Sequence, residues 1–296
     1  MTSAPPRLLP AARWLASSDG GADTSPGVRG IADLLARRLA ADPARPLVTF
    51  YDDGTGERVE FSATTFDNWV AKTANMLVDT VGLEPGDPVG MDLPPHWLAL
   101  VIALATWSAG LELVLVDADG PVAQTATGTA PDRLGALFVA EDRLEATADL
   151  AVDETVALSL RPLGGRLARP VPGVLDYAAE VPPHGDRFAA PPPPPEQAAL
   201  VRAAAGIAAA WELGPADRIL VTSAPSTPTG LLGGLLAPLA AGASIVLCRR
   251  LDPAVLERRV EAERVSAILA GPDEAEPAVT ASSGPAPRPL RLPRLG

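Results

Sequence analysis

Residues 213–248 decide the fold of this chain, and they read LGPADRILVTSAPSTPTGLLGGLLAPLAAGASIVLC. Gly242 predicts the end of an apolar helix, because glycine adopts the left-handed conformation at low cost. The β-rich and apolar runs around it predict a βαβ unit. Its expected parts are a turn, a strand, a polar loop, a buried helix and a second strand, at 213–217, 218–222, 223–229, 231–241 and 244–248.

An earlier stretch, residues 83–117, has the same layout: LEPGDPVGMDLPPHWLALVIALATWSAGLELVLVD. Pro85 corresponds to Pro215, 130 positions later, and Gly110 corresponds to Gly242, 132 positions later. The difference of two between these offsets corresponds to one small loop insertion. Two such units predict two related half-sheets, and a cleft between such halves is a common place for a ligand.

The fold class we expect is therefore α/β, with two related parallel-sheet βαβ subdomains. Proline clusters cannot pair within a sheet, so the run AAPPPPP at 189–195 is interpreted as a stiff connector. Both chain ends are rich in Pro, Ser and Ala, which predicts disorder. The expected parts are a flexible N-terminus (1–26), a first α/β subdomain (27–187), the connector (188–195), a partial second α/β subdomain (196–270) and a disordered tail (271–296).

The composition limits the partners. The 296 residues carry a net charge of −12, which argues against nucleic acid or an anionic membrane as a partner. The single cysteine, Cys248, excludes an internal disulfide, and it falls in a predicted buried strand, where an inert core thiol is expected. We therefore expect a cytoplasmic protein.

Two apolar stretches, 97–116 and 229–248, are long enough to cross a membrane. Each divides at a glycine into a helix and a β-branched strand, and neither has basic flanks. Buried βαβ units have the same hydropathy, so we interpret both stretches as parts of a soluble protein. The N-terminus has no basic region followed by an unbroken apolar run, which argues against a signal peptide.

The remaining elements follow from periodicity. A β-hairpin is expected over 47–62, with Asp52 and Asp53 in a solvated turn. A helix is expected over 64–81, with Thr64 or Thr65 as its N-cap and Lys72 facing solvent. Further helices are expected at 30–41, 196–213 and 253–264, and a strand is expected at 265–270.

One polar loop is a candidate binding site. It lies at the carboxyl end of a predicted strand and just before a helix N-terminus, where α/β sheets bind ligands and helix amides favour anions. Hydroxyls before a helix are also preferred N-caps, so a simple capping turn is the alternative. The candidate residues are Thr222, Ser223, Ser226, Thr227, Thr229 and Gly230.

Catalytic groups are scarce in the sequence. The two histidines, His96 and His184, have no second ligand at helical spacing, so we expect no metal site. His96 stands at a predicted helix start, where a structural role is expected. Lys72 is the single lysine. No phosphate-binding or nucleophile motif is present, and we expect no catalytic residues and no cofactor.

Four blocks resemble the N-terminal domain of AMP-forming acyl-CoA synthetases and adenylation domains. They are LLARRLAADPARPLVTF, FSATTFDNWVAKTANML, the 83–117 unit and the stretch ADRILV…VSAIL, and they cover about 30–117 and 197–270. The resemblance implies two related subdomains, and it is nearest to a short actinobacterial branch. It also implies that the mobile C-terminal domain and its catalytic lysine are absent.

The chain departs from the family where the phosphate is held. The family's loop ending in Pro-Lys-Gly is expected before the 196–213 helix, where this chain has AAPPPPP. Proline supplies neither free N–H groups nor flexibility for a phosphate cradle. A rival alignment would make TSAPSTPTG the decayed phosphate loop, with Thr229 at the lysine position, but the flanking blocks favour the first alignment.

Three functions remain open at this stage. The first is a non-catalytic binding or regulatory protein with a small molecule or nucleotide in the cleft. The second is an acyl-adenylate-forming ligase completed by a partner chain, which would need ATP and Mg²⁺. The third is a structural partner of a full-length synthetase, for which an exposed apolar patch would be evidence. The absence of the family's phosphate-loop lysine favours the first function, the non-catalytic one, because stabilisation of charge is usually the largest catalytic contribution.

Overall fold

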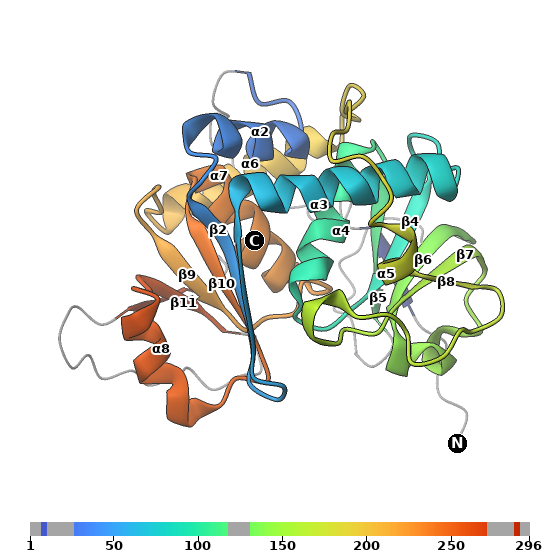
Figure 1. The fold of residues 1–296 in the computed structure, drawn as a ribbon. Helices are drawn as coiled ribbons and strands as arrows, with labels where there is room; N and C mark the ends of the chain where they lie inside the picture. The colour runs from blue at the N-terminus through green and yellow to red at the C-terminus, as the bar shows by residue number, and fades with distance from the viewer. Residues whose placement is uncertain (1–6, 11–26, 118–130, 271–286, 291–296) are drawn as a thin grey trace.

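The computed structural model describes residues 7–10, 27–117, 131–270 and 287–290, which form two six-stranded sheets with helices between and around them (Figure 1). The first sheet runs, edge to edge, through β1 (Arg7–Pro10), β5 (Glu112–Asp117), β4 (Pro88–Asp92), β6 (Leu134–Ala140), β7 (Val152–Leu158) and β8 (Val174–Asp176). The second runs through β12 (Arg288–Leu290), β11 (Ala267–Leu269), β9 (Arg218–Val221), β10 (Ser244–Arg249), β2 (Pro46–Asp52) and β3 (Glu57–Ser62).

Neighbouring strands pair in parallel except at two edges, where β1 joins β5 and β3 joins β2 in antiparallel fashion. The α/β class with two parallel-sheet units is thus confirmed. The helices are α2 (Ile31–Ala41), α3 (Ala63–Asn75), α4 (Trp97–Ser108), α5 (Tyr177–Glu180), α6 (Gln197–Ala210), α7 (Ala237–Ala241) and α8 (Leu256–Ala262).

Two helices contain a wider π-helical turn. It extends α3 over Met76–Thr80, and it precedes α7 over Thr229–Leu236, so the expected helix at 231–241 forms with mixed geometry. The N-cap of α3 is Ser62 rather than Thr64 or Thr65, because the Ser62 hydroxyl accepts a hydrogen bond from the Thr65 amide at 3.2 Å. The sequence alone could not decide which of these three nearby hydroxyl residues is the N-cap.

The internal repeat is visible in matching hydrogen bonds. The Asp87 carboxylate accepts a bond from the Glu84 amide, and the Asp217 carboxylate accepts one from the Gly214 amide, both at 2.8 Å. In each turn the aspartate amide also donates back at 3.0 Å, to the carbonyl of Glu84 or Gly214. The sequence offset of 130 therefore corresponds to two turns of the same structure.

The repeat extends to the strand order. In the first sheet β5, β4 and β6 lie side by side, and in the second β10, β9 and β11 lie in the same relation. Gly110 and Gly242, which follow the helix of each unit, both have left-handed backbones with φ of 76° and 73°. The predicted glycine stops are confirmed, because other residues are strained in that conformation.

The sequence-based boundaries differ from the sheets in three places. The hairpin β2–β3, grouped with the first subdomain, belongs to the second sheet, because β2 pairs in parallel with β10. Residues 7–10 and 288–290, expected in flexible or disordered ends, form the edge strands β1 and β12. The rest of 1–26 and of the 271–296 tail lies outside the described residues. Edge pairing depends on a distant partner strand, which local composition does not reveal.

Helix α4 is at the centre of the molecule, and all twelve of its residues are buried. It lies between the sheets and contacts α2 and α3, while α8 covers the outer face of the second sheet (Figure 1). The apolar stretch 97–116 is therefore a core helix followed by a core strand, as expected. Among the described residues, no helix combines the length and apolar character that crossing a membrane requires.

Candidate functional site

The carboxyl edges of the two sheets share a pocket of about 370 Å³. Residues that follow β6 and β7 form one wall, and the last residue of β10 contributes from the other sheet. Polar groups gather here because loops leave parallel strands at their carboxyl ends, the usual ligand position in α/β sheets. The lining residues are Glu141, Asp142, Ser159, Leu160, Arg161, Ala168 and Arg249.

Arg249 is the contribution of the second sheet. Its side chain is 17% exposed, and its Nη1 lies 3.8 Å from Oδ2 of Asp52. Burial lowers the pKa of Arg249, while the charge of Asp52 opposes that shift and Asp142 also favours the cation. An arginine remains charged despite such a shift. The pocket therefore has a fixed, partly desolvated positive charge that can hold an anion.

Asp52 supports the position of Arg249. It is 1% exposed, accepts from Nε of Arg250 at 2.8 Å and from the Gly54 amide at 2.9 Å, and also bonds Nη2 of Arg250. Burial by itself raises the pKa of Asp52, but Arg250, Gly54 and Arg249 together bring it below its usual value. The expectation of a solvated turn is wrong at Asp52, because arginines from the neighbouring strand cover it. It is also wrong at Asp53, whose side chain is 15% exposed and pairs with Arg259 at 2.6 Å.

The opposite wall is held by hydrogen bonds from Glu141 and Ser159. Glu141 accepts from the Ala168 amide at 2.9 Å and pairs with Nη2 of Arg161 at 3.4 Å. The Ser159 hydroxyl donates to the Gly165 carbonyl and accepts from the Arg161 amide at 3.3 Å. These bonds fix the loop that follows β7.

Backbone strain accompanies both walls. Leu160 has φ of 50° and Arg250 has φ of 51°, a left-handed conformation that costs free energy for residues with large side chains. Each follows the end of a strand at this edge. Strained residues of this kind are concentrated at binding and catalytic sites. Glu212 and Arg264, which precede β9 and β11 at the opposite edge, have the same conformation, so the strain is not confined to the pocket.

The predicted loop lies on the same edge of the second sheet, one strand away. It follows β9, and Val221 at the end of β9 pairs with Leu247 of β10. Thr227 acts as a capping residue: its hydroxyl donates to the Ala224 carbonyl at 2.7 Å and accepts from the Gly230 amide at 3.2 Å. None of the six candidate residues lines the pocket with Arg249.

The other members of the predicted set have different environments. The Thr222 amide donates to the Leu269 carbonyl at 3.2 Å, which ties the loop to β11. Ser223 is 4% exposed, and its hydroxyl has no partner within the described part of the chain. Ser226 and Thr229 are half-buried. The structure thus brings the six residues together as a turn, in which a capping function is observed at Thr227.

Gly230 allows the loop to fold back onto its own helix. A Cβ at this position would lie 2.0 Å from the carbonyl oxygen of Ala224 and 2.5 Å from its carbonyl carbon. No side chain can occupy that space without moving the backbone. Gly230, one of the six predicted residues, is therefore required for the shape of the turn.

Two groups able to do covalent or acid–base chemistry, His96 and Cys248, are buried. His96 is buried, its Nδ1 accepts from the Leu98 amide at 3.2 Å, and burial lowers its pKa to about 3. The expected structural role of His96 as the start of α4 is confirmed. Cys248 is also buried as expected, and burial raises the pKa of its thiol to about 12.

Lys72 differs from its expected solvated position. Its Nζ donates to the Pro182 carbonyl at 3.1 Å and to the His184 carbonyl. The amine therefore fastens the 182–184 segment to α3. The sequence could not show this contact, because the two segments are more than 100 residues apart.

Sequence reasoning missed the pocket residues, although a signal was present. Glu141 and Asp142 directly follow the short apolar run 137–140, Arg161 follows the apolar run 155–160, and Arg249 follows the predicted strand 244–248. Polar residues directly after buried strands indicate the carboxyl edge of a sheet. The repeat predicted two half-sheets with a cleft between them, but it did not specify which strand ends meet there.

The fold and the position of the pocket define a class of α/β protein with two facing parallel sheets. A family model of the AMP-binding enzymes matches residues 35–199, which is more than half of the 296 residues. The chain belongs to the AMP-binding enzyme family. The resemblance drawn from the sequence blocks is thereby confirmed.

One relative is similar over most of its length. A TIGR03089 family protein of Mycobacterium tuberculosis is 40% identical over 243 residues, which is 80% of this chain and 96% of that protein. The similarity agrees with the expected short actinobacterial branch. The name of that relative states no activity.

Solved structures share the fold. An acyl-CoA synthetase from Brucella canis has a TM-score of 0.62 at 16% identity, covering 88% of this chain and 50% of that chain. Acetoacetyl-CoA synthetase from Streptomyces lividans has a TM-score of 0.62 at 18% identity, covering 81% and 42%. An anthranilate CoA ligase in complex with anthranoyl-AMP has 0.64 at 15%, covering 83% and 50%. The chain spans about half the length of these synthetases.

Proposed function

We propose that this protein is a non-catalytic binding or regulatory member of the AMP-binding enzyme family. Its ligand is an adenylate or acyl-adenylate, held in the pocket between the two carboxyl edges. The observation that carries the proposal is the convergence of Arg249 from one sheet with Glu141, Asp142 and Arg161 from the other. Family membership supports the choice of an adenylate over other small anions.

The pocket chemistry suits such a ligand. A guanidinium presents parallel donors that match phosphate oxygens, so Arg249 and Arg161 are suited to the phosphate. Carboxylates accept bonds from hydroxyls, so Glu141 and Asp142 are suited to the ribose. The volume of about 370 Å³ falls within the range of small-molecule sites.

Catalysis is disfavoured by the roles of the reactive groups. Lys72 is engaged with backbone carbonyls, His96 is a buried helix cap, and Cys248 is a buried thiol. In the preferred alignment the connector prolines occupy the position of the family's phosphate loop. Pro193 lies against Gly30, where a Cβ would come within 2.5 Å of it, so the connector is closely packed there.

A thermal-shift titration with AMP, Mg·ATP and a non-hydrolysable acyl-adenylate tests the proposal. A ligand at about 100 times its Kd adds about 2.7 kcal/mol to the free energy of unfolding. We expect AMP or the acyl-adenylate to raise Tm, and Arg249→Ser or Arg161→Ser to reduce the shift. Arg258→Ser, an exposed arginine on α8, is the matched control and is expected to retain it. The absence of a shift with every adenylate would contradict the proposal.

An acyl-adenylate-forming ligase completed by a partner chain is the second candidate. It is favoured by the structural likeness to a ligase solved with anthranoyl-AMP. ATP–pyrophosphate exchange is the direct measurement, made with the protein alone and with candidate partner chains. Saturable exchange would replace the binding proposal with this one. The third candidate is a structural partner of a full-length synthetase, for which an exposed apolar patch would be evidence. Among the described residues, the exposed large hydrophobic side chain is Val78, at 38%.

A further inference from the structure

Two consecutive arginines lie within reach of one buried carboxylate at the carboxyl end of β10. Arg249 ends this strand, and its Nη1 is 3.8 Å from Oδ2 of Asp52, which is too long for a hydrogen bond. Arg250 follows and is bound more closely, because its Nε donates to Oδ1 of Asp52 at 2.8 Å and its Nη2 donates to Oδ2. Of the two neighbouring guanidinium groups, it is therefore Arg250 that forms the hydrogen bonds.

The strand register favours the other partner. β10 and β2 pair so that Arg249 stands opposite Asp52. Adjacent residues of a regular strand point to opposite faces of the sheet, so Arg250 would point away from Asp52 if the strand continued. The backbone is instead left-handed at Arg250, with φ of 51°. Arg250 reaches the carboxylate because the chain leaves strand geometry there, in a conformation that costs free energy for a residue with a Cβ.

The hairpin turn between β2 and β3 leaves room for the Arg250 guanidinium at Gly54. A Cβ on Gly54 would lie 2.4 Å from both Cζ and Nε of Arg250. The backbone of Gly54 is not left-handed, so the position needs the missing side chain rather than the conformational freedom of glycine. The Gly54 amide also donates to Oδ1 of Asp52 at 2.9 Å. Gly54 and Arg250 thus bind the carboxylate together.

This pairing leaves the side chain of Arg249 available to the pocket at the carboxyl edges. Its main chain is held, since its carbonyl accepts a bond from the Asp53 amide at 3.2 Å, so a change of partner would involve the side chain alone. Within the part of the chain that the structure describes, the Arg249 guanidinium forms no hydrogen bond. Arg249 lines the pocket, whereas Arg250 is not among its lining residues.

We propose that Arg250 is a positioning residue of this pocket: by occupying Asp52, it keeps the Arg249 guanidinium available for the phosphate of the ligand. The inference rests on the proposed adenylate function for the identity of that ligand. A buried carboxylate without a partner is destabilising, so displacement of Arg250 is expected to draw Arg249 onto Asp52. Arg249 would then have to leave this ion pair before it could bind a phosphate, and the affinity would fall.

The variant Gly54→Ala tests the proposal without changing any charge. The new Cβ displaces the Arg250 guanidinium, and alanine is compatible with the backbone at position 54. Isothermal titration calorimetry measures the affinity for AMP or for the non-hydrolysable acyl-adenylate. We expect it to fall about tenfold, because a hydrogen bond to a charged group contributes about that factor. Gly214→Ala, where a Cβ meets nothing within 4 Å, is the matched control and is expected to keep the affinity.

A rescue experiment separates positioning from an effect on stability. Asp52→Asn removes the charge that would hold Arg249, so Gly54→Ala/Asp52→Asn is expected to recover most of the lost affinity. Asp52→Asn is itself expected to lower stability, because it breaks a buried ion pair. A purely structural effect would therefore become larger in the double variant, whereas a positioning effect would become smaller. The Tm of each variant checks that it is folded.

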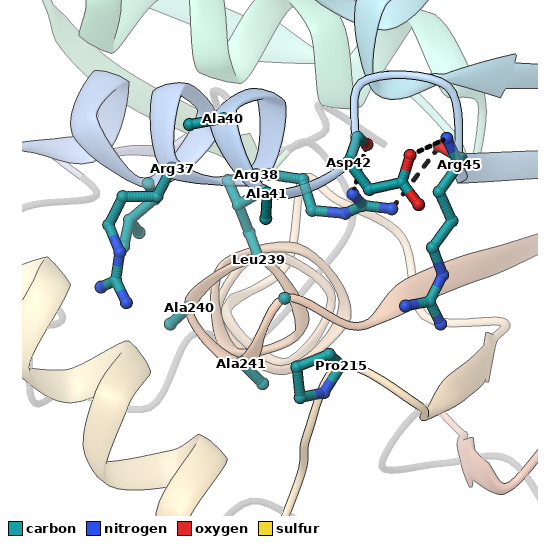
Figure 2. A pocket seen from close by; sticks show the side chains of 12 residues that line it. Arg37, Arg38, Ala40, Ala41, Asp42, Arg45, Pro215, Leu239, Ala240 and Ala241 are labelled. Carbon is teal, nitrogen blue, oxygen red and sulfur yellow. Dashed lines mark hydrogen bonds between the residues drawn. The ribbon is translucent and has the colours of Figure 1, made fainter.

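Arg250→Gln is a second variant, which removes the guanidinium itself and is also expected to weaken adenylate binding about tenfold. Its control removes one arginine charge elsewhere. Arg37 on α2 is exposed and lines a pocket of about 430 Å³ at the opposite, amino edge of the second sheet. Figure 2 shows that its side chain lies beside the last turn of α7. Arg37→Gln is expected to keep the affinity for the adenylate.

Unchanged affinity in Gly54→Ala would overturn the proposal, and so would a further loss in Gly54→Ala/Asp52→Asn. If the wild-type protein binds no adenylate, the proposed function fails, and NMR of the arginine side chains tests the positioning separately. The Nε–H signal of Arg249, assigned with Arg249→Lys, is expected to shift in ligand-free Gly54→Ala as Arg249 bonds to Asp52. An unchanged signal would show that Arg250 does not determine the partner of Arg249.

Discussion

The imidazole of His96 lies against the ring of Phe50, with ring centroids 4.7 Å apart and an interplanar angle of 59°. His96 caps α4, in the repeat unit of the first sheet, and Phe50 lies on β2, in the second. The contact therefore joins the two halves just below their carboxyl edges. Both residues are fully buried, so the joint excludes water.

The stability of the protein is expected to fall as the pH drops from about 6.5 toward 3. Burial, and then the charge of Arg249, lowers the pKa of His96 to about 3, whereas an unfolded histidine has a pKa of about 6.5. Below 6.5 the unfolded chain takes up a proton that the folded protein excludes. The loss is up to about 1.4 kcal/mol per pH unit, and urea unfolding between pH 7 and 5 measures it.

The variant His96→Asn isolates this contribution. Asparagine can cap a helix but does not titrate, so the variant is expected to be less stable at pH 7 and to lose most of the slope between pH 7 and 5. His184→Asn replaces the other histidine and is expected to keep the slope. A slope that persists in His96→Asn would show that another group is responsible.

Replacement of Gly230 by alanine is expected to destabilise the protein by about 1 to 3 kcal/mol, because overpacking forces the backbone to shift. The new Cβ would lie 2.0 Å from the Ala224 carbonyl oxygen. Gly214→Ala is the control, since a Cβ at that position meets nothing within 4 Å. Equal stability of the two variants in urea unfolding would contradict the observed closeness of the loop to its helix.

The Cys248 thiol is expected to react with a thiol reagent only when the protein unfolds. It is buried in β10, and burial raises its pKa to about 12, so the reactive thiolate is rare at neutral pH. The rate of modification should therefore rise with urea in step with the loss of structure. Rapid modification in native buffer would show that β10 is accessible.

The variant Asp52→Asn is expected to cost about 2 to 3 kcal/mol, because it removes a buried charge that Arg250 bonds twice. It also removes the carboxylate 3.8 Å from Arg249, so adenylate binding is expected to change. Asp153→Asn removes a carboxylate from an exposed pair with Arg133 and is expected to have little effect. Calorimetry of the two variants under identical conditions measures the difference.

Much of the fold could be predicted from local pattern. The apolar runs and the glycines after each helix predicted both βαβ units, because periodicity and positive φ are local properties of the chain. The hydrogen bonds of Asp87 and Asp217 repeat with the sequence offset. The buried environments of His96 and Cys248 also followed from their positions in apolar elements.

The candidate site was predicted only in part. The predicted loop follows β9 at the same edge as the candidate pocket, but the pocket is lined by strand-end residues such as Glu141 and Arg249, which are 108 positions apart in the sequence. The pairing of Lys72 with a distant loop and of Asp52 with Arg250 was likewise not visible.

The sequence by itself determined the elements of the two βαβ units, their repeat and their family resemblance, because these depend on residue type and spacing along the chain. Tertiary structure alone decided that the hairpin β2–β3 joins the second sheet through β10. It also decided which charges meet around Arg249 at the carboxyl edges of the two sheets. The physical reason is that strand pairing and the burial of charge depend on partners brought close only by the complete fold.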